Sequence, residues 1–209
     1  MRGKGRKKER KMVPGNRVNI IVGEGGSDIR YFNEVGRIYE TDHIHKIDAK
    51  GKSLTYIKNR CLQQMKEMGP DDYLAVVIDV DDRTSETIME MEEWCCKNNI
   101  GLFVSNPSIE VFLLMHYKDV SPNWTQSDLE RELSSVLGRP YRKSEGIEPD
   151  EKMIEGAIAR AEKVLPKGDN EMERVLERPG RTNAHRLIQK LRDLTSDRRR
   201  EMLERRKKR

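Results

Sequence analysis

Short apolar runs alternate with amphipathic segments through the first 117 residues of the chain. The apolar runs have the length of strands and cover residues 17–22, 43–48, 73–79 and 101–105. The segments with helical spacing of apolar residues follow them, at residues 27–39, 53–68, 84–98 and 109–117. This β-α-β-α-β-α-β-α order predicts an α/β fold with parallel strands joined by right-handed crossovers.

The chain beyond residue 120 is polar and has the pattern of a mainly helical region. Amphipathic helices are predicted at residues 129–138, 151–165 and 183–194. The resulting organisation is a basic arm, an α/β domain, a helical C-terminal region packed on that domain, and a basic tail. Their predicted bounds are residues 1–16, 17–120, 121–197 and 198–209.

The composition indicates one domain with a modest core. Of the 209 residues, 35% are hydrophobic and 37% are charged. A run of about 18 apolar residues, which a membrane span would need, is missing, so no membrane association is expected. The basic N-terminus lacks the apolar stretch of a signal peptide, and Cys61, Cys95 and Cys96 form no CxxC pair. We therefore expect a cytoplasmic protein.

The net charge of +5 is distributed unevenly along the chain. Residues 1–11 hold seven Lys or Arg against one acid, and residues 198–209 hold eight against two. Each end therefore carries +6, which leaves −7 for residues 12–197. Basic tails of this kind attract polyanions such as nucleic acid, or they only keep the chain in solution, and both interpretations stay open here.

Polar residues follow three of the predicted strands directly. Glu24 comes after the first, Asp79 to Asp82 after the third, and Ser105 to Pro107 after the fourth. The functional crevice of an open parallel sheet lies at the carboxyl ends of its strands. These three groups are therefore predicted to share one edge of the sheet.

Asp79 and Asp81 have the spacing of a metal-binding pair. Two positions apart in extended backbone, their carboxylates project to the same side. Mg²⁺ is bound in this way, by one or two carboxylates together with water and phosphate oxygens. The alternative is that these acids cap the next helix, a role for which Asp82 is well placed.

Glu24 lies in a glycine-rich turn that matches neither common phosphate-binding loop. Asp28 stands where the dinucleotide fingerprint GxGxxG requires its third glycine, and GxxxxGK[ST] is missing from the chain. Next to the aspartates, Glu24 could hold a second metal ion or act as a general acid or base. The alternative is an acid that only faces solvent.

Three segments, in this order, resemble the TOPRIM-type domain of RloB-like proteins, an abortive-infection family. They are "IVGEGGSDIRYF", "VVIDVDD" and "FVSNPSIEVFLLMHY". Downstream, "YRKSEG", "GAIARAEKVL" and "RPGRTNAHRLIQKL" are similar to further family segments, so the resemblance covers about residues 17–195. Ile109 replaces a phenylalanine of the family pattern, which exchanges one apolar residue for another.

The resemblance implies a TOPRIM-like parallel sheet flanked by helices, and a Mg²⁺ (or Mn²⁺) ion used for phosphodiester chemistry. Its implied metal ligands are Glu24, Asp79 and Asp81. The implied catalytic residues are Glu24, Asp79, Asp81, Glu110, His116 and Lys143. Two of these roles have an open alternative. His116 lies in an apolar helix and fits a hydrogen-bonded core histidine equally well. Lys143 could simply pair with Glu145.

The resemblance and the shared sheet edge together predict a Mg²⁺-dependent nuclease that cleaves DNA or RNA, with tRNA as one candidate substrate, and the resemblance implies a role in prokaryotic anti-phage defence. The expected nucleic-acid contacts are Lys7, Lys8, Arg10, Lys11, Arg30, Asn106 and Lys143. One alternative is an effector subunit that is inactive until a partner ATPase releases it, because the family is often encoded beside an ATPase and this chain has no P-loop. A non-catalytic nucleic-acid binder is the other alternative, and formation of a homo-oligomer is left open.

Overall fold

The computed structural model has a five-stranded sheet at its centre and describes residues 18–22, 26–39, 44–48, 53–70, 72–81 and 83–207. The strands are β1 (Val18–Val22), β2 (Ile44–Asp48), β3 (Tyr73–Asp79), β4 (Gly101–Asn106) and β5 (Arg181–Thr182). Their order is β2-β1-β3-β4-β5, with β1 to β4 mutually parallel and β5 antiparallel to β4. The predicted α/β fold with a parallel sheet is confirmed.

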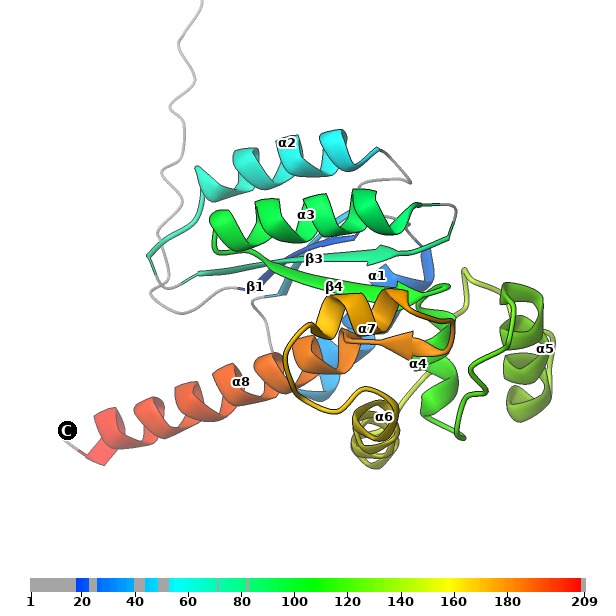
Figure 1. Cartoon of the computed structure of the whole chain (residues 1–209). Helices are drawn as coiled ribbons and strands as arrows, with labels where there is room; N and C mark the ends of the chain where they lie inside the picture. Colours follow the sequence, from blue (N-terminus) through cyan, green and yellow to red (C-terminus); the bar gives the residue numbers. More distant parts are fainter. Residues whose placement is uncertain are drawn as a thin grey trace, which may run out of the picture.

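Eight helices surround this sheet in the described part of the chain. They are α1 (Gly26–Ile38), α2 (Leu54–Met65), α3 (Ser85–Lys97), α4 (Glu110–Met115), α5 (Gln126–Leu137), α6 (Glu151–Val164), α7 (Glu171–Leu176) and α8 (Ala184–Lys207). Helices α2 and α3 cover one face of the sheet, while α1, α4 and α8 lie on the other (Figure 1). The sequence pattern did not predict α7 or β5, and α8 runs 13 residues beyond its predicted end at residue 194.

Short polar side chains start several helices, as their sequence positions suggest. Ser53, Thr84 and Asp150 each accept a hydrogen bond from a backbone N–H in the first turn of α2, α3 and α6. The cap of α3 is Thr84, whose hydroxyl lies 3.3 Å from the backbone nitrogen of Thr87. Thr84, and not the suggested Asp82, is therefore the residue at the cap position, and Asp82 itself lies outside the described residues.

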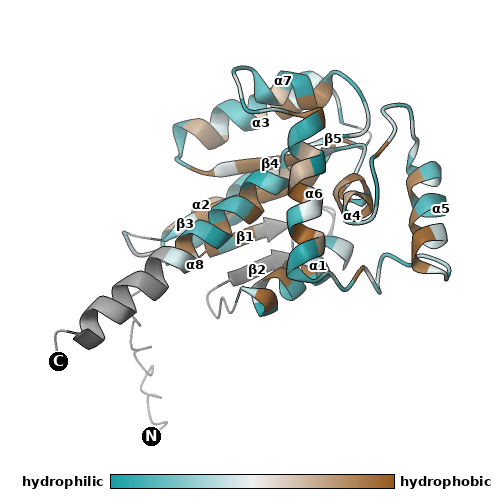
Figure 2. Cartoon of the chain, turned by 90° about the horizontal axis from the view of Figure 1, so that it is seen from below, coloured by the Kyte–Doolittle hydropathy of each residue, from teal (hydrophilic) through white to brown (hydrophobic). Residues whose placement is uncertain are grey.

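The two faces of the sheet are filled by alternate residues of the same strands. In β3, Leu74, Val76 and Ile78 contact the layer of α2 and α3, whereas Ala75 and Val77 contact the layer of α1 and α4. Helix α4 is buried along its whole length, and its hydrophobic colour in Figure 2 contrasts with the mixed colouring of α5 and α6. The carboxyl end of β3 thus sits between two packed layers.

The strand order reverses between β1 and β3. The connection from β1 leads to β2 on one side, while β3 pairs with β1 on the other side. In open α/β sheets this switch point opens a crevice at the carboxyl ends of the strands. Val22, the last residue of β1, pairs with Val77, and Asp79 ends β3 two residues later at that edge.

Asn183 completes the sheet where β5 is too short to do so. Its side-chain oxygen accepts a hydrogen bond from the backbone of Val104 (2.6 Å), and its side-chain nitrogen donates to the carbonyl of Leu102 (3.3 Å). The backbone N–H of Asn183 also donates to the Val104 carbonyl (3.1 Å). One buried side chain therefore continues the ladder of β4 and holds the start of α8 against it.

None of the helices in the described part of the chain is long and apolar enough to cross a membrane.

Replacing the side chain of Asn183 tests its role in the sheet. We expect Asn183→Ala to lower the free energy of unfolding by about 2 to 3 kcal/mol, because a buried Val104 N–H loses its acceptor. Urea unfolding followed by circular dichroism measures the change. Asn123→Ala, at an exposed asparagine, is the matched control and should stay within about 0.5 kcal/mol of the parent. Equal stabilities for the two variants would contradict this role.

Candidate functional site

Asp79 and Asp81 lie at the carboxyl end of β3, held by the end of β4 and the residue that follows it. Asp79 is 4% exposed and pairs in register with Ser105. The backbone N–H of Val80 donates to Ser105 (2.9 Å), and that of Asp81 donates to Pro107 (3.1 Å). Asp81 has a φ of 39°, a left-handed conformation that aspartate adopts more readily than most residues. The turn therefore fixes one buried and one exposed carboxylate at the same edge.

Glu110, the first residue of α4, is completely buried and surrounded by hydroxyl groups. The hydroxyl of Tyr141 donates to its Oε1 at 2.9 Å, and that of Ser108 lies 2.6 Å from its Oε2. Ser27 of α1 is a longer contact, with its Oγ 3.4 Å from Oε1. A buried carboxylate needs such donors, because burial without partners costs several kcal/mol. Three separate parts of the chain thus meet at Glu110.

Lys143 interacts electrostatically with the acids at this edge of the sheet. Its Nζ lies 3.9 Å from Oε1 of Glu110, and its side chain is 55% exposed. Partial burial lowers the pKa of Lys143, but nearby carboxylates outweigh this effect and raise it overall. These carboxylates belong to Glu110, Glu130, Asp79 and Asp81. Lys143 is therefore a stable cation in the field of all four.

Lys143 is paired with a different acid from the one that the sequence suggested. Glu145, the alternative partner, forms its ion pairs with Arg139 and Arg142. Lys143 instead faces Glu110. A cation close to Asp79, Asp81 and Glu110 is placed where a phosphate group could be bound.

The loop of residues 139–146 carries Tyr141 and Lys143 back to the sheet and is tied to α1. Nη1 of Arg30 donates to the Ser144 carbonyl (3.4 Å), and its Nη2 lies 3.7 Å from Glu148. Gly146 has a φ of +59°, and a Cβ there would approach the Arg30 side chain to 3.2 Å. Arg30, expected to contact nucleic acid, thus supports the backbone next to Lys143.

Two acids join this edge that the sequence pattern did not single out. Asp28 in the first turn of α1 is 3% exposed and contributes to the raised pKa of Tyr141, after burial and Glu110. Glu130 of α5 accepts a hydrogen bond from Gln126 (2.9 Å), whose Oε1 lies 2.5 Å from Ser108 Oγ. Asp28 looks like an ordinary acid of a helix start, and Glu130 lies 51 residues from Asp79, so neither has a local sequence signature.

The expected metal ligands are only partly described. Glu24 lies outside the described residues, while Asp79 and Asp81 are in place at the edge. Within the described ranges, no three Asp, Glu, His or Cys side chains lie close enough together to hold an ion. The available donors are carboxylate oxygens, which match the preference of Mg²⁺ for one or two carboxylates plus water and phosphate.

His116 lies in the core, at the end of α4 opposite to Glu110. It is 4% exposed; its Nδ1 lies 2.9 Å from the Phe112 carbonyl and its Nε2 lies 3.2 Å from the Tyr31 hydroxyl. Nδ1 must donate to the carbonyl, so Nε2 accepts from Tyr31. Burial lowers the pKa of His116 to about 4, so the ring is neutral at pH 7. This geometry favours the core histidine over a catalytic one.

Asn106 also has a structural position. Its side chain is 6% exposed and donates to the carbonyls of Val175 (3.0 Å) and Leu176 (3.4 Å) at the end of α7. Both N–H groups of the amide are thus used within the protein, which does not support direct contact with nucleic acid. The expected contacts Lys7, Lys8, Arg10 and Lys11 lie outside the described residues.

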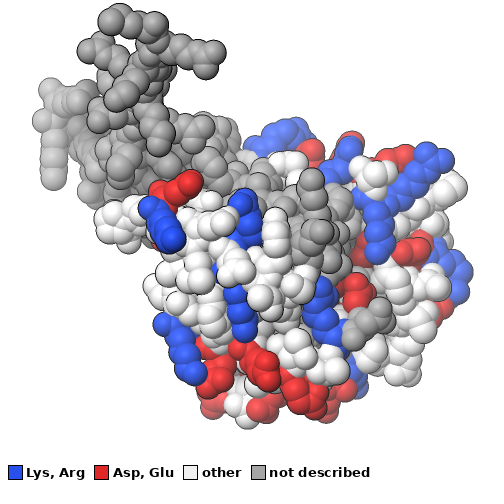
Figure 3. All heavy atoms as spheres, turned by 90° about the horizontal axis from the view of Figure 1, so that it is seen from above, with Lys and Arg blue, Asp and Glu red and all other residues white. Residues whose placement is uncertain are grey.

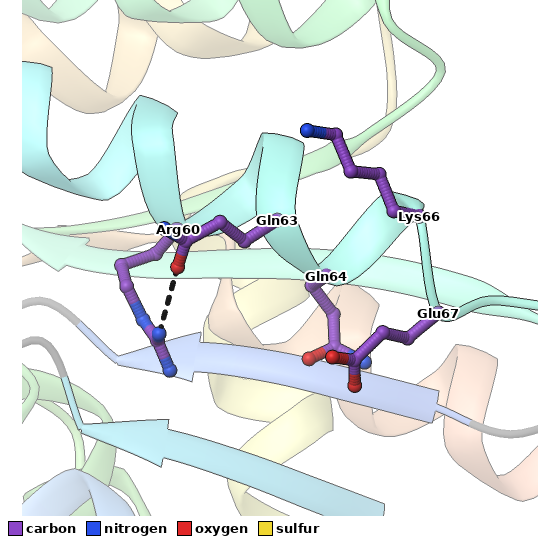
Figure 4. Close-up of a pocket in the computed structure, with 5 residues that line it drawn as sticks. All are labelled: Arg60, Gln63, Gln64, Lys66 and Glu67. Atoms are coloured by element: carbon purple, nitrogen blue, oxygen red, sulfur yellow. Dashed lines mark hydrogen bonds between the residues drawn. The ribbon is translucent and has the colours of Figure 1, made fainter.

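A pocket of about 300 Å³ lies elsewhere, at the C-terminal end of α2 (Figure 4). Arg60 and Gln63 are hydrogen-bonded in it (2.9 Å), and Gln64 reaches Asn19 of β1 (3.1 Å). Lys66 and Glu67 complete its lining. Asn19 lies near the start of β1, so this pocket is at the opposite edge of the sheet from Asp79. It does not contain the residues that carry the chemistry.

Comparison with known protein families matches residues 19–191 to the family described as RloB-like protein. The comparisons with curated proteins and with solved structures returned no match.

The role of Arg30 can be tested by proteolysis. Arg30→Ala removes a support worth about 1 kcal/mol, so the open population of the loop, and cleavage by trypsin after Arg142 and Lys143, should rise about three- to fivefold. Mass spectrometry of the fragments measures this rate. Arg37→Ala on the same helix, where Arg37 pairs with Glu34 only three residues away, is the matched control. Equal cleavage rates for both variants would show that Arg30 does not hold the loop.

The neutral core state of His116 predicts a pH dependence of stability. The unfolded chain binds a proton at about pH 6.5, but the folded chain only at about pH 4, so the stability contributed by the neutral ring is lost as the pH falls through this window. Between pH 7 and pH 5 the loss is about 2 kcal/mol. His116→Gln should lose about that much less over the same range, as measured by urea unfolding. Parallel pH profiles for variant and parent would contradict the assignment.

Proposed function

The chain belongs to the RloB-like family, and on this premise we propose that it is a metal-dependent nuclease with its reaction centre at the carboxyl edge of β3. The observation that carries the proposal is that Lys143 lies 3.9 Å from Glu110 of α4 and that its pKa is raised by Glu110 and by Asp79 and Asp81 at the end of β3. Carboxylates that hold a cation, next to a lysine that holds phosphate, form a common arrangement for phosphodiester cleavage.

Asp79 and Asp81 are the residues proposed to hold the metal ion, together with Glu24. Their hard oxygen donors suit Mg²⁺ or Mn²⁺. When bound, such an ion polarises a phosphate and lowers the pKa of a coordinated water. Asp79 is buried and fixed by the β3–β4 register, so it would hold the ion at a defined place, and the exposed Asp81 would be the ligand open to solvent.

Lys143 is proposed to bind the scissile phosphate. Its pKa is raised by the surrounding acids, so the side chain carries a full charge throughout the neutral range. Its 55% exposure leaves donors available to a ligand. An ammonium placed there would offset the charge that develops on the phosphate during cleavage.

Glu110 is proposed to be a positioning residue. Its carboxylate oxygens already accept hydrogen bonds from the hydroxyl groups of Tyr141 and Ser108, and it is completely buried. A group so enclosed exchanges protons with substrate poorly, but it orients Lys143 and the loop that carries it. We therefore propose that Glu110 keeps Lys143 in position.

The biological setting is proposed from the family alone. We infer a role in prokaryotic anti-phage defence, with an ATPase as the partner that controls activity. A cleavage assay with and without the ATPase separates two versions of this proposal: a chain that cleaves alone, and an effector that cleaves only with its partner.

The test is a cleavage assay with purified protein on duplex DNA, single-stranded DNA and structured RNA, including tRNA. We expect products with Mg²⁺ or Mn²⁺ and none after chelation with EDTA. Asp79→Asn, which keeps the size but removes the charge, should reduce the rate about 100-fold or more. Asp193→Asn, at an exposed aspartate of α8, is the matched control and should cleave at the parent rate.

Lys143 is tested in the same assay by two variants. Lys143→Ala should lose most of the rate, and Lys143→Arg should recover part of it because the charge remains. Identical products and rates for Asp79→Asn and the parent would refute the nuclease proposal. Binding of nucleic acid without cleavage in any metal, alone or with the ATPase, would favour the non-catalytic alternative.

A further inference from the structure

Helix α8 begins at the same edge of the sheet as the candidate site. The backbone N–H of Ala184 donates to the hydroxyl oxygen of Thr182 (3.0 Å), and Thr182 pairs in register with Ser105, which pairs with Asp79. Adjacent strands are about 4.8 Å apart, so the start of α8 lies roughly 10 Å from Asp79.

The helix then crosses the body to the opposite edge. Nζ of Lys190 lies 5.5 Å from the ring centroid of Tyr73, the first residue of β3. Arg192 donates a hydrogen bond to Glu155 of α6 (2.8 Å) and interacts electrostatically with Tyr39, which follows the end of α1. The remainder of α8 projects beyond the body at that side (Figure 1).

The charges change where the helix leaves the body. Arg186 and Arg192, within the packed part, form ion pairs with acids of α6 and α7. Residues 195–207, here called the α8 arm, hold six Lys or Arg against three acids, a net charge of +3, and Lys208 and Arg209 follow. The face of the body in Figure 3, by contrast, mixes both signs, with acids gathered along one side.

We propose that the α8 arm binds the phosphate backbone of the same nucleic acid that reaches the carboxyl edge of β3. This inference rests on the proposed function and extends it to the size of the substrate. At 1.5 Å per residue, Arg198 and Lys207 lie roughly 21 and 35 Å along the helix from Ala184. With the offset from Asp79, the arm is roughly 25 to 35 Å from the candidate site, or about 7 to 10 base pairs at 3.4 Å each.

The composition of the arm favours nucleic acid over a membrane surface. A helix that lies in a bilayer interface needs an apolar face along its length. The α8 arm has only Met202 and Leu203 as large apolar residues. An arm with this charge and so few large apolar residues is suited to a polyanion in water, and a substrate long enough to touch arm and site gains affinity from both.

The test is binding measured by fluorescence anisotropy in EDTA, so that cleavage plays no part. Duplexes of about 6 and about 20 base pairs are compared, because only the longer one can span arm and site. The variant Arg198→Glu/Arg199→Glu/Arg200→Glu changes the arm. Lys152→Glu/Lys167→Glu/Arg178→Glu changes three exposed body residues by the same total charge and is the matched control.

The arm variant should bind the long duplex about tenfold or more weakly, and its slope of log affinity against log salt should fall by about 2 to 3. Its binding of the short duplex should match that of the control. A truncation after Ser196 should behave like the arm variant and keep the parent melting temperature, because the packed part of α8 is intact.

Equal binding of the long duplex by arm variant and control would overturn the proposal, as would an equal loss on both duplexes. Arm-dependent binding to anionic lipid vesicles but not to duplex would overturn it in favour of a membrane surface. Length-dependent binding through the arm without cleavage in any metal would refute the nuclease proposal alone. Cleavage of nucleic acid that depends on Asp79 but is unaffected by changes in the arm would refute this inference alone.

Discussion

The buried carboxylate of Glu110 is the constraint on which the candidate site depends. A completely buried acid is tolerated only with donors around it, and this one receives them from three regions far apart in sequence. Satisfying Glu110 therefore fixes the first turn of α1, the turn before α4 and the loop that carries Tyr141. Lys143 comes into place as a consequence, because it belongs to the same loop.

The sequence predicted well what depends on local pattern. Four apolar runs became β1 to β4, and the alternation in β3 matches its two packed faces. It did not predict β5 or α7, because two and six residues are too short to show a period, and β5 pairs with β4 through two residues alone, Arg181 and Thr182. Asp28 and Glu130 were missed for a related reason, since only the fold brings Asp28 near Tyr141 and Glu130 near Lys143.

Helix α4 shows why nearness in sequence misled the assignment of His116. Glu110 and His116 lie at opposite ends of a six-residue helix that is buried throughout. One end reaches the carboxyl edge, while the other packs against Tyr31 and Phe112. A motif that spans such a helix therefore combines residues of the site with residues of the core, and only their contacts separate the two.

The balance of charge at the carboxyl edge affects how the proposed site binds phosphate. Four carboxylates act on Lys143, so acids outnumber the cation they surround. An edge of this kind attracts divalent ions and repels phosphate, most strongly where Asp79 is shielded from water. In the proposed reaction, a divalent ion bound at this edge would offset that repulsion, so the affinity of the edge for a phosphate group, unlike that of the α8 arm, would rise with the concentration of the free ion.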